Sequence, residues 1–67
     1  MKKYVYRGNC YSLENVRKIS LLGSEISILY VDGYVETLRL GNTTESMRHI
    51  IFEEICKNAW QNSLDVL

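Results

Sequence analysis

The chain has 67 residues, of which 46% are hydrophobic, and its eight basic and eight acidic residues give a formal net charge of zero. This length predicts a single small domain, residues 1–67, with a thin core, and the apolar share is too high for a disordered chain. The charge balance excludes a strong overall attraction to nucleic acid or to anionic membranes.

Targeting signals are not expected. Lys2 and Lys3 are followed by no apolar run of about seven to fifteen residues, as a signal peptide would require. No segment approaches the roughly 20 apolar residues of a membrane span. We therefore predict a cytoplasmic protein that does not bind membranes, with Cys10 and Cys56 as reduced thiols. The asparagine-, isoleucine- and tyrosine-rich composition favours a bacterial or phage origin.

Alternating apolar and polar residues predict four strands. Residues 1–7 form the first, which Gly8 and Asn9 end, and residues 10–15 give no clear prediction. The clearer three strands, separated by turns at Gly23-Ser24 and Asp32-Gly33, are residues 16–22, 26–31 and 34–40.

Two registers are possible at the Asp32-Gly33 turn. A two-residue turn pairs Val31 with Tyr34, whereas a three-residue loop with a bulge at Gly33 pairs Tyr30 with Tyr34. A one-residue slip exchanges the two faces of a strand. We predict the bulged loop because it gathers most large apolar residues on one face: Ile19, Leu21, Ile26, Ile28, Tyr30, Tyr34, Leu38 and Leu40.

Two charged residues interrupt that face, Arg17 and Glu36. If Glu36 is buried it needs a partner, and Arg17 is the expected one. At the sheet margin, both would instead keep their charged ends in water.

Residues 43–61 predict a helix. Asn42 is the expected cap, with Glu45 completing a capping box, and Thr43 is a rival cap. Helical spacing places six residues on one stripe, which should cover the sheet: Met47, Ile51, Phe52, Ile55, Cys56 and Ala59. The predicted fold is therefore α+β, an antiparallel three- or four-stranded β-meander packed against one C-terminal amphipathic helix.

The sequence predicts no catalytic, metal or cofactor site. Cys10, His49 and Cys56 include no closely spaced pair of zinc ligands. His49 and Cys56 are separated by roughly 10 Å along the helix, too far for a nucleophile and its base. Glycine-rich phosphate motifs do not occur in the sequence. We therefore expect a non-enzymatic protein without a cofactor.

An interaction surface is the favoured functional prediction. Four residues should cluster on the outer face of the meander, namely Val16, Leu29, Val31 and Val35. The strand at residues 1–7 covers this patch in one interpretation and leaves it exposed in the other. Ile50 and Trp60 fall outside the helix stripe. Exposed apolar patches and open strand edges favour association, so we predict a protein-interaction or regulatory module, a homodimer or a binder of another protein.

Two alternatives remain open. A nucleic-acid binder would use the basic, tyrosine-containing first strand, through Lys3, Tyr4, Tyr6 and Arg7. A small-ligand binder would use a pocket between protomers, lined by tyrosines and Trp60.

The order of elements from Asn15 to Ile55 is a meander with an Asp-Gly turn, followed by a capped helix. This order broadly resembles small bacterial proteins of flagellar operons, and also the first half of LytTR-type DNA-binding domains. The resemblance implies an α+β fold and carries no functional residues. The second half of LytTR domains, with its basic DNA-contacting segment, has no counterpart in this sequence.

Overall fold

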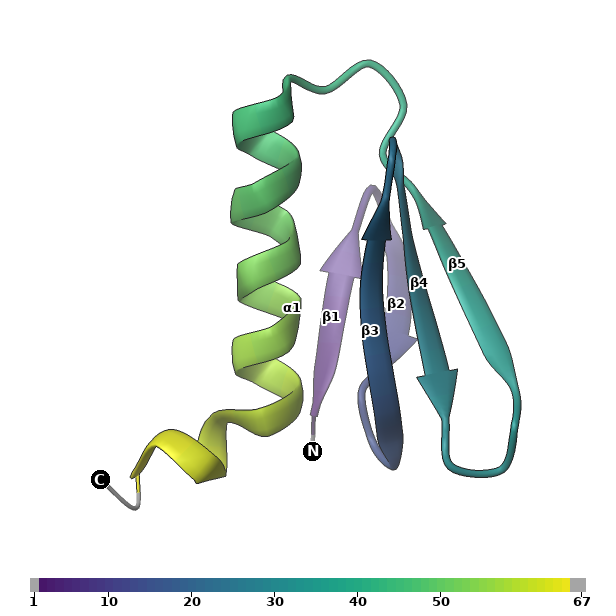
Figure 1. Cartoon of the computed structure of the whole chain (residues 1–67), viewed down its shortest axis with the longest axis vertical. Helices are drawn as coiled ribbons and strands as arrows, with labels where there is room; N and C mark the ends of the chain where they lie inside the picture. The colour runs from purple at the N-terminus through teal and green to yellow at the C-terminus, as the bar shows by residue number, and fades with distance from the viewer. Residues whose placement is uncertain (1, 66–67) are drawn as a thin grey trace.

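The computed structural model describes the backbone of residues 2–65 and the side chains of residues 2–60. It is an α+β fold with a three-stranded antiparallel meander, as predicted, and a separate two-stranded sheet (Figure 1). The elements are β1 (Lys3–Tyr6), β2 (Asn9–Ser12), β3 (Val16–Leu22), β4 (Glu25–Tyr30), β5 (Val35–Arg39) and α1 (Glu45–Asp65).

The N-terminal hairpin differs from the prediction. The first strand is not a fourth strand of the meander, because it pairs with β2 in its own sheet. The two central residues of its turn, Arg7 and Gly8, both have positive φ angles, 50° and 80°. This is the geometry of a two-residue hairpin turn, whose twist matches that of the flanking strands. The strand at residues 9–12 was missed because Arg7 gives little signal for such a turn. Met1 lies outside the described residues.

The meander has the predicted bulged register. The Tyr30 amide donates to the Tyr34 carbonyl oxygen at 2.9 Å, and Leu29 pairs with Val35. Gly33, at φ 96°, donates its amide to the Tyr30 carbonyl oxygen. The three-residue loop therefore sets one face of β4 and β5 against the core, as the distribution of apolar residues indicated.

A second bulge, at Arg17, was not predicted. Val16 pairs with Tyr30, and Lys18 pairs with Leu29, so Arg17 is the extra residue. The bulge turns Val16 to the inner face, where it packs against the core, and the prediction of Val16 on the outer face is wrong. Of the two possibilities for Arg17 and Glu36, the structure shows the margin position: Arg17 is exposed, and Glu36 is partly buried and accepts a hydrogen bond from the Tyr34 hydroxyl.

The core lies between the inner face of the meander, the hairpin and α1. Tyr4, Tyr6 and Tyr11 of the hairpin pack against it, so the hairpin shares the core of the meander. Within residues 2–60 the buried side chains are all apolar: Leu13, Ile19, Ile26, Ile28, Leu38, Leu40, Ile51, Ile55 and Ala59.

The helix stripe is confirmed except at its start. Ile51, Ile55 and Ala59 are buried, whereas Met47 is exposed. Met47 lies in the first turn of α1, which extends past the end of β1 (Figure 1). The stripe therefore begins one turn later than predicted.

The ends of α1 also differ from the prediction. The Met47 amide donates to Thr44 Oγ1 at 3.2 Å, so Thr44 caps the helix in place of Asn42 or Thr43. Thr43 Oγ1 accepts a hydrogen bond from Arg48 Nε. The helix continues to Asp65, beyond the predicted residue 61, with an interruption at Trp60, whose φ of −124° and ψ of 29° are not helical. Figure 1 shows the last turns running in a different direction.

Two isoleucines of α1 provide a test of the buried face. Ile55→Ala should lower the free energy of unfolding by about 2–5 kcal/mol, because Ile55 is fully buried and its truncation leaves a cavity. Ile50→Ala removes the same atoms from a side chain that is 49% exposed, and should change stability by less than about 0.5 kcal/mol. Urea denaturation followed by the fluorescence of Trp60 measures both. Similar losses in the two variants would show that another face of α1 is buried.

Candidate functional site

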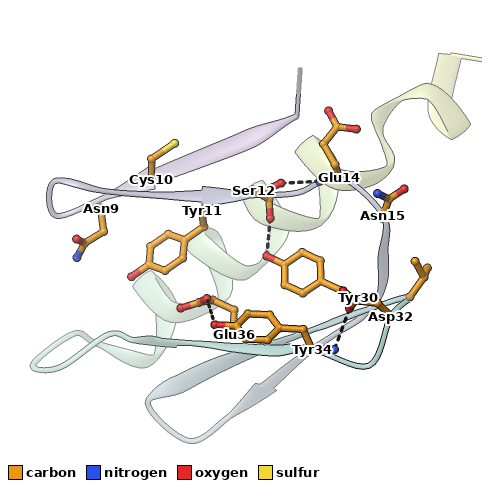
Figure 2. Close-up of a pocket in the computed structure, with 11 residues that line it drawn as sticks. Asn9, Cys10, Tyr11, Ser12, Glu14, Asn15, Tyr30, Asp32, Tyr34 and Glu36 are labelled. Carbon is orange, nitrogen blue, oxygen red and sulfur yellow. Dashed lines mark hydrogen bonds between the residues drawn. The ribbon is translucent and has the colours of Figure 1, made fainter.

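A cleft of about 750 Å³ opens between β2 and the adjoining ends of β4 and β5 (Figure 2). Its volume is in the range of binding pockets in proteins. Its walls come from β2, from the connection between β2 and β3, from the loop between β4 and β5, and from the inner face of β5. The cleft therefore brings together residues far apart in the sequence.

The wall formed by β2 is an unpaired strand edge. The two-residue turn makes Tyr6–Asn9 and Tyr4–Tyr11 the hydrogen-bonded pairs of the hairpin. The bond from the Leu13 amide to the Lys2 carbonyl oxygen, 2.9 Å, continues this alternation. The backbone N–H and C=O groups of the residues in between, Cys10 and Ser12, consequently point away from β1.

One of these outward groups is already engaged. The Tyr30 hydroxyl donates to the Ser12 carbonyl oxygen at 2.6 Å (Figure 2). For the Cys10 N–H and C=O, the described residues provide no hydrogen-bond partner. This part of β2 offers one donor and one acceptor to an added strand.

Tyrosine rings form the opposite wall. The ring centroids of Tyr30 and Tyr34 are 5.9 Å apart and their planes are tilted by 34°. The Tyr34 hydroxyl donates to Glu36 Oε1 at 3.2 Å, and the Tyr34 side chain is 59% exposed. In Figure 2 the Tyr11 ring points from β2 toward the same space, whereas the Cys10 side chain points away from it. The cleft thus has aromatic surface on both sides.

Three acidic residues line the cleft, Glu14, Asp32 and Glu36, and in Figure 2 the Glu14 carboxylate points away from the tyrosine rings. Glu14 Oε2 accepts the Lys2 amide at 2.9 Å, and Asp32 Oδ1 accepts the Tyr34 amide at 2.9 Å. The negative charge of Glu36 is the main cause that raises the pKa of Tyr34. Burial, and then the charge of Glu36, raises the pKa of Tyr30. Both hydroxyls therefore stay protonated at neutral pH.

The end of the cleft is closed by a backbone contact. The Val31 amide donates to the Asn15 carbonyl oxygen at 2.9 Å, which ties the β4–β5 loop to the start of β3. Asn15 has a φ of 59°, a conformation that asparagine tolerates better than most residues. This contact fixes the β4–β5 loop beside the connection between β2 and β3.

The residues predicted for a protein interface do not form one surface. Leu29 and Val35 are paired neighbours on the outer face, and the exposed Val31 follows in the adjacent loop. The hairpin does not cover them, because its tyrosines pack on the inner side. Ile50 and Trp60 are exposed on α1, and α1 packs on the inner side of the meander. Val16, as described above, is turned inward.

The residues predicted for nucleic-acid contact also separate. The Tyr4 hydroxyl donates to Glu54 Oε1, and the Tyr6 hydroxyl donates to the Leu40 carbonyl oxygen. Burial, with the hydrogen bond and charge of Glu54, raises the pKa of Tyr4 to about 12. Both rings pack against the core, whereas Lys3 is exposed and the Arg7 guanidinium lies 5.4 Å from the centroid of the Tyr6 ring. The four side chains therefore do not present a row of rings for stacking.

The cysteines and other ligating side chains are dispersed. Cys10 is exposed, and the partly buried Cys56 has a pKa raised by burial and by the charge of Glu53. Within residues 2–60, His, Cys, Asp and Glu side chains form no group of three that is placed to hold a metal ion. None of the helical segments described combines the length and apolar character that crossing a membrane requires.

Comparisons with known proteins give no assignment: no protein-family model, curated protein or solved structure matches this chain. The resemblance to flagellar-operon proteins and LytTR domains has no support from these comparisons. The interpretation of the site therefore depends on its geometry.

Sequence reasoning found only part of this site. The bulged register correctly placed Tyr30, Tyr34 and Glu36 on one face. Tyr11 and Glu14 were missed because the strand at residues 9–12 was not predicted. The idea of a tyrosine-lined pocket between protomers included Trp60, but the cleft is formed within one chain and Trp60 does not line it.

Replacing Glu36 tests the electrostatics of the cleft. Glu36→Gln should lower the pKa of Tyr34 toward the ordinary tyrosine value of about 10, because it removes the charge and keeps an oxygen for the hydrogen bond. The pKa of Tyr4 should stay at about 12, since its causes are burial and Glu54. NMR titration of the tyrosine Cζ resonances measures both. An unchanged pKa of Tyr34 would mean that the Glu36 carboxylate does not lie beside the Tyr34 hydroxyl.

Proposed function

We propose that this protein is a non-enzymatic protein-interaction module that binds an extended segment of another protein in the cleft, as an added strand along β2. The observation that carries this proposal is the open edge of β2 beside a tyrosine-lined cavity. Extended peptides commonly bind by adding a strand to an exposed sheet edge, where main-chain hydrogen bonds give affinity and side-chain pockets give specificity.

The dimensions of the cleft suit this mode of binding. The four residues of β2 span about 13 Å at roughly 3.3 Å per residue. The outward N–H and C=O of Cys10 would exchange hydrogen bonds with the added strand. Side chains of that strand that point to the inner side would lie against Tyr11 and Tyr34.

Tyr34 is the expected centre of the interface. The residue is more than half exposed, and its ring is supported from one side by the ring of Tyr30. Tyrosine contributes large apolar area with little conformational entropy loss, so it is often a dominant residue of protein interfaces. A bound strand would cover the exposed face of this ring.

Substitutions at the edge of β2 and at Tyr34 test the proposal. Peptides that bind the immobilised protein are first selected from a random library displayed on phage. The affinity of the selected peptides for the protein is then measured in solution. Tyr34→Ala should weaken binding at least tenfold without unfolding the domain, because the side chain is exposed. Cys10→Pro should abolish binding, because proline removes the outward amide and is tolerated at an edge strand.

Val5→Pro is the matched control for Cys10→Pro. Val5 lies opposite Cys10 on β1, and its amide points away from β2 toward the other edge of the hairpin. Binding should survive this substitution. The proposal would be contradicted if the selected peptides bound Tyr34→Ala as tightly as the unmodified protein. It would also be contradicted if peptide binding shifted protein amide resonances only outside β2.

Self-association is a second candidate, because the outer face of the meander is uncovered. Leu29, Val31 and Val35 lie together there, beside the free edge of β5. A homodimer through this face would bury them and would be insensitive to salt. Light scattering on a size-exclusion column at low and high salt tests it, and Val31→Glu should then give a monomer. A monomer at high concentration would exclude this candidate and leave the cleft proposal unaffected.

A further inference from the structure

The cleft is negatively charged although the chain as a whole is neutral. Three of its eleven lining residues are acidic, and none is lysine, arginine or histidine. The basic and acidic side chains of the whole chain are equal in number. A concave site lined by one sign of charge concentrates that potential and attracts ligands of the opposite sign.

The carboxylates retain acceptor capacity for a ligand. Glu36 Oε1 and Asp32 Oδ1 each accept one hydrogen bond, from the hydroxyl and from the amide of Tyr34. The second oxygen of each carboxylate accepts no hydrogen bond from the described residues. An ionised carboxylate has about four acceptor positions, so both can accept a charged donor while keeping these bonds.

The tyrosine rings provide a second attraction for cations. The face of an aromatic ring is negative and attracts an ammonium or guanidinium group within about 6 Å of its centroid. The protein already contains such a contact, between Arg7 and the ring of Tyr6 at 5.4 Å. Tyr34 exposes its ring beside Glu36, so a cation placed there would meet a ring face and a carboxylate together.

From this arrangement we infer that the extended segment bound along β2 is basic, with lysine or arginine at alternating positions; this inference rests on the function proposed above. Alternate residues of a strand point to the same side and lie about 7 Å apart. Two such side chains would reach the Tyr34–Glu36 pair and the carboxylate of Asp32. The charge of the cleft thus sets the class of partner, and the edge of β2 sets its extended conformation.

Three capped peptides of equal length test the inference, with threonine alternating with lysine, with glutamine or with glutamate. Binding is followed by the amide resonances of Cys10, Ser12 and Tyr34. The lysine peptide should bind at least about tenfold more tightly than the glutamine peptide, and the glutamate peptide should bind most weakly. The preference for lysine should shrink when salt is raised from about 0.05 M to about 0.5 M, since salt screens these charges.

Two variants show whether the cleft carboxylates cause the preference. Glu36→Gln should reduce the preference for lysine at least about fivefold, and the new amide keeps an acceptor oxygen for the existing hydrogen bond from Tyr34. Glu53→Gln also removes one negative charge, from the exposed surface of α1. This control should leave the preference for lysine unchanged.

The outcomes distinguish this inference from the proposed function. Equal affinities for the lysine and glutamine peptides, with shifts in the cleft, would overturn the inference and leave the function standing. If no peptide at millimolar concentration shifted the amide resonances of the cleft, both the inference and the proposed function would be overturned. An equal loss of preference in Glu53→Gln would show that general charge, rather than the cleft, selects the lysine peptide.

Discussion

The register of the β4–β5 hairpin is the constraint on which both the core and the cleft depend. Its three-residue loop requires a positive φ at Gly33, and it pairs Tyr30 with Tyr34. A slip by one residue would place Leu38 and Leu40 on the face opposite Ile26 and Ile28. The same slip would remove Tyr34 and Glu36 from the cleft. Folding stability and the geometry of the site are therefore fixed by one backbone feature.

The cleft exists because the strands form two sheets rather than one. Residues 9–12 pair with β1, and the chain then crosses to β3 through Leu13, which is fully buried. The hairpin is held at a fixed distance from the meander by the bond from the Tyr30 hydroxyl to the Ser12 carbonyl oxygen. A hairpin joined to the meander as a fourth strand would have closed this edge. The division of the sheet leaves the edge of β2 open.

The features that could be predicted depend on repeated signals along several residues. Apolar alternation and a glycine turn determined the meander, and helical spacing identified Ile51, Ile55 and Ala59. The features that were missed each depend on a single backbone choice: the bulge at Arg17, the turn at Arg7 and the cap at Thr44. Several residues tolerate each of these conformations, so the sequence carries little signal for them. The cleft combines both kinds of feature, and only its β4–β5 wall was foreseen.

Glu36 is the residue whose position is hardest to explain by stability alone. It lies on the inner face of the meander, opposite the fully buried Ile28, on a strand whose next inward residue is the buried Leu38. An apolar side chain there would extend a core that is thin for so short a chain. A carboxylate instead keeps this end of the core open and charged. Sequences tend to depart from the pattern that favours folding at sites of function, which supports a binding role for this end of the sheet.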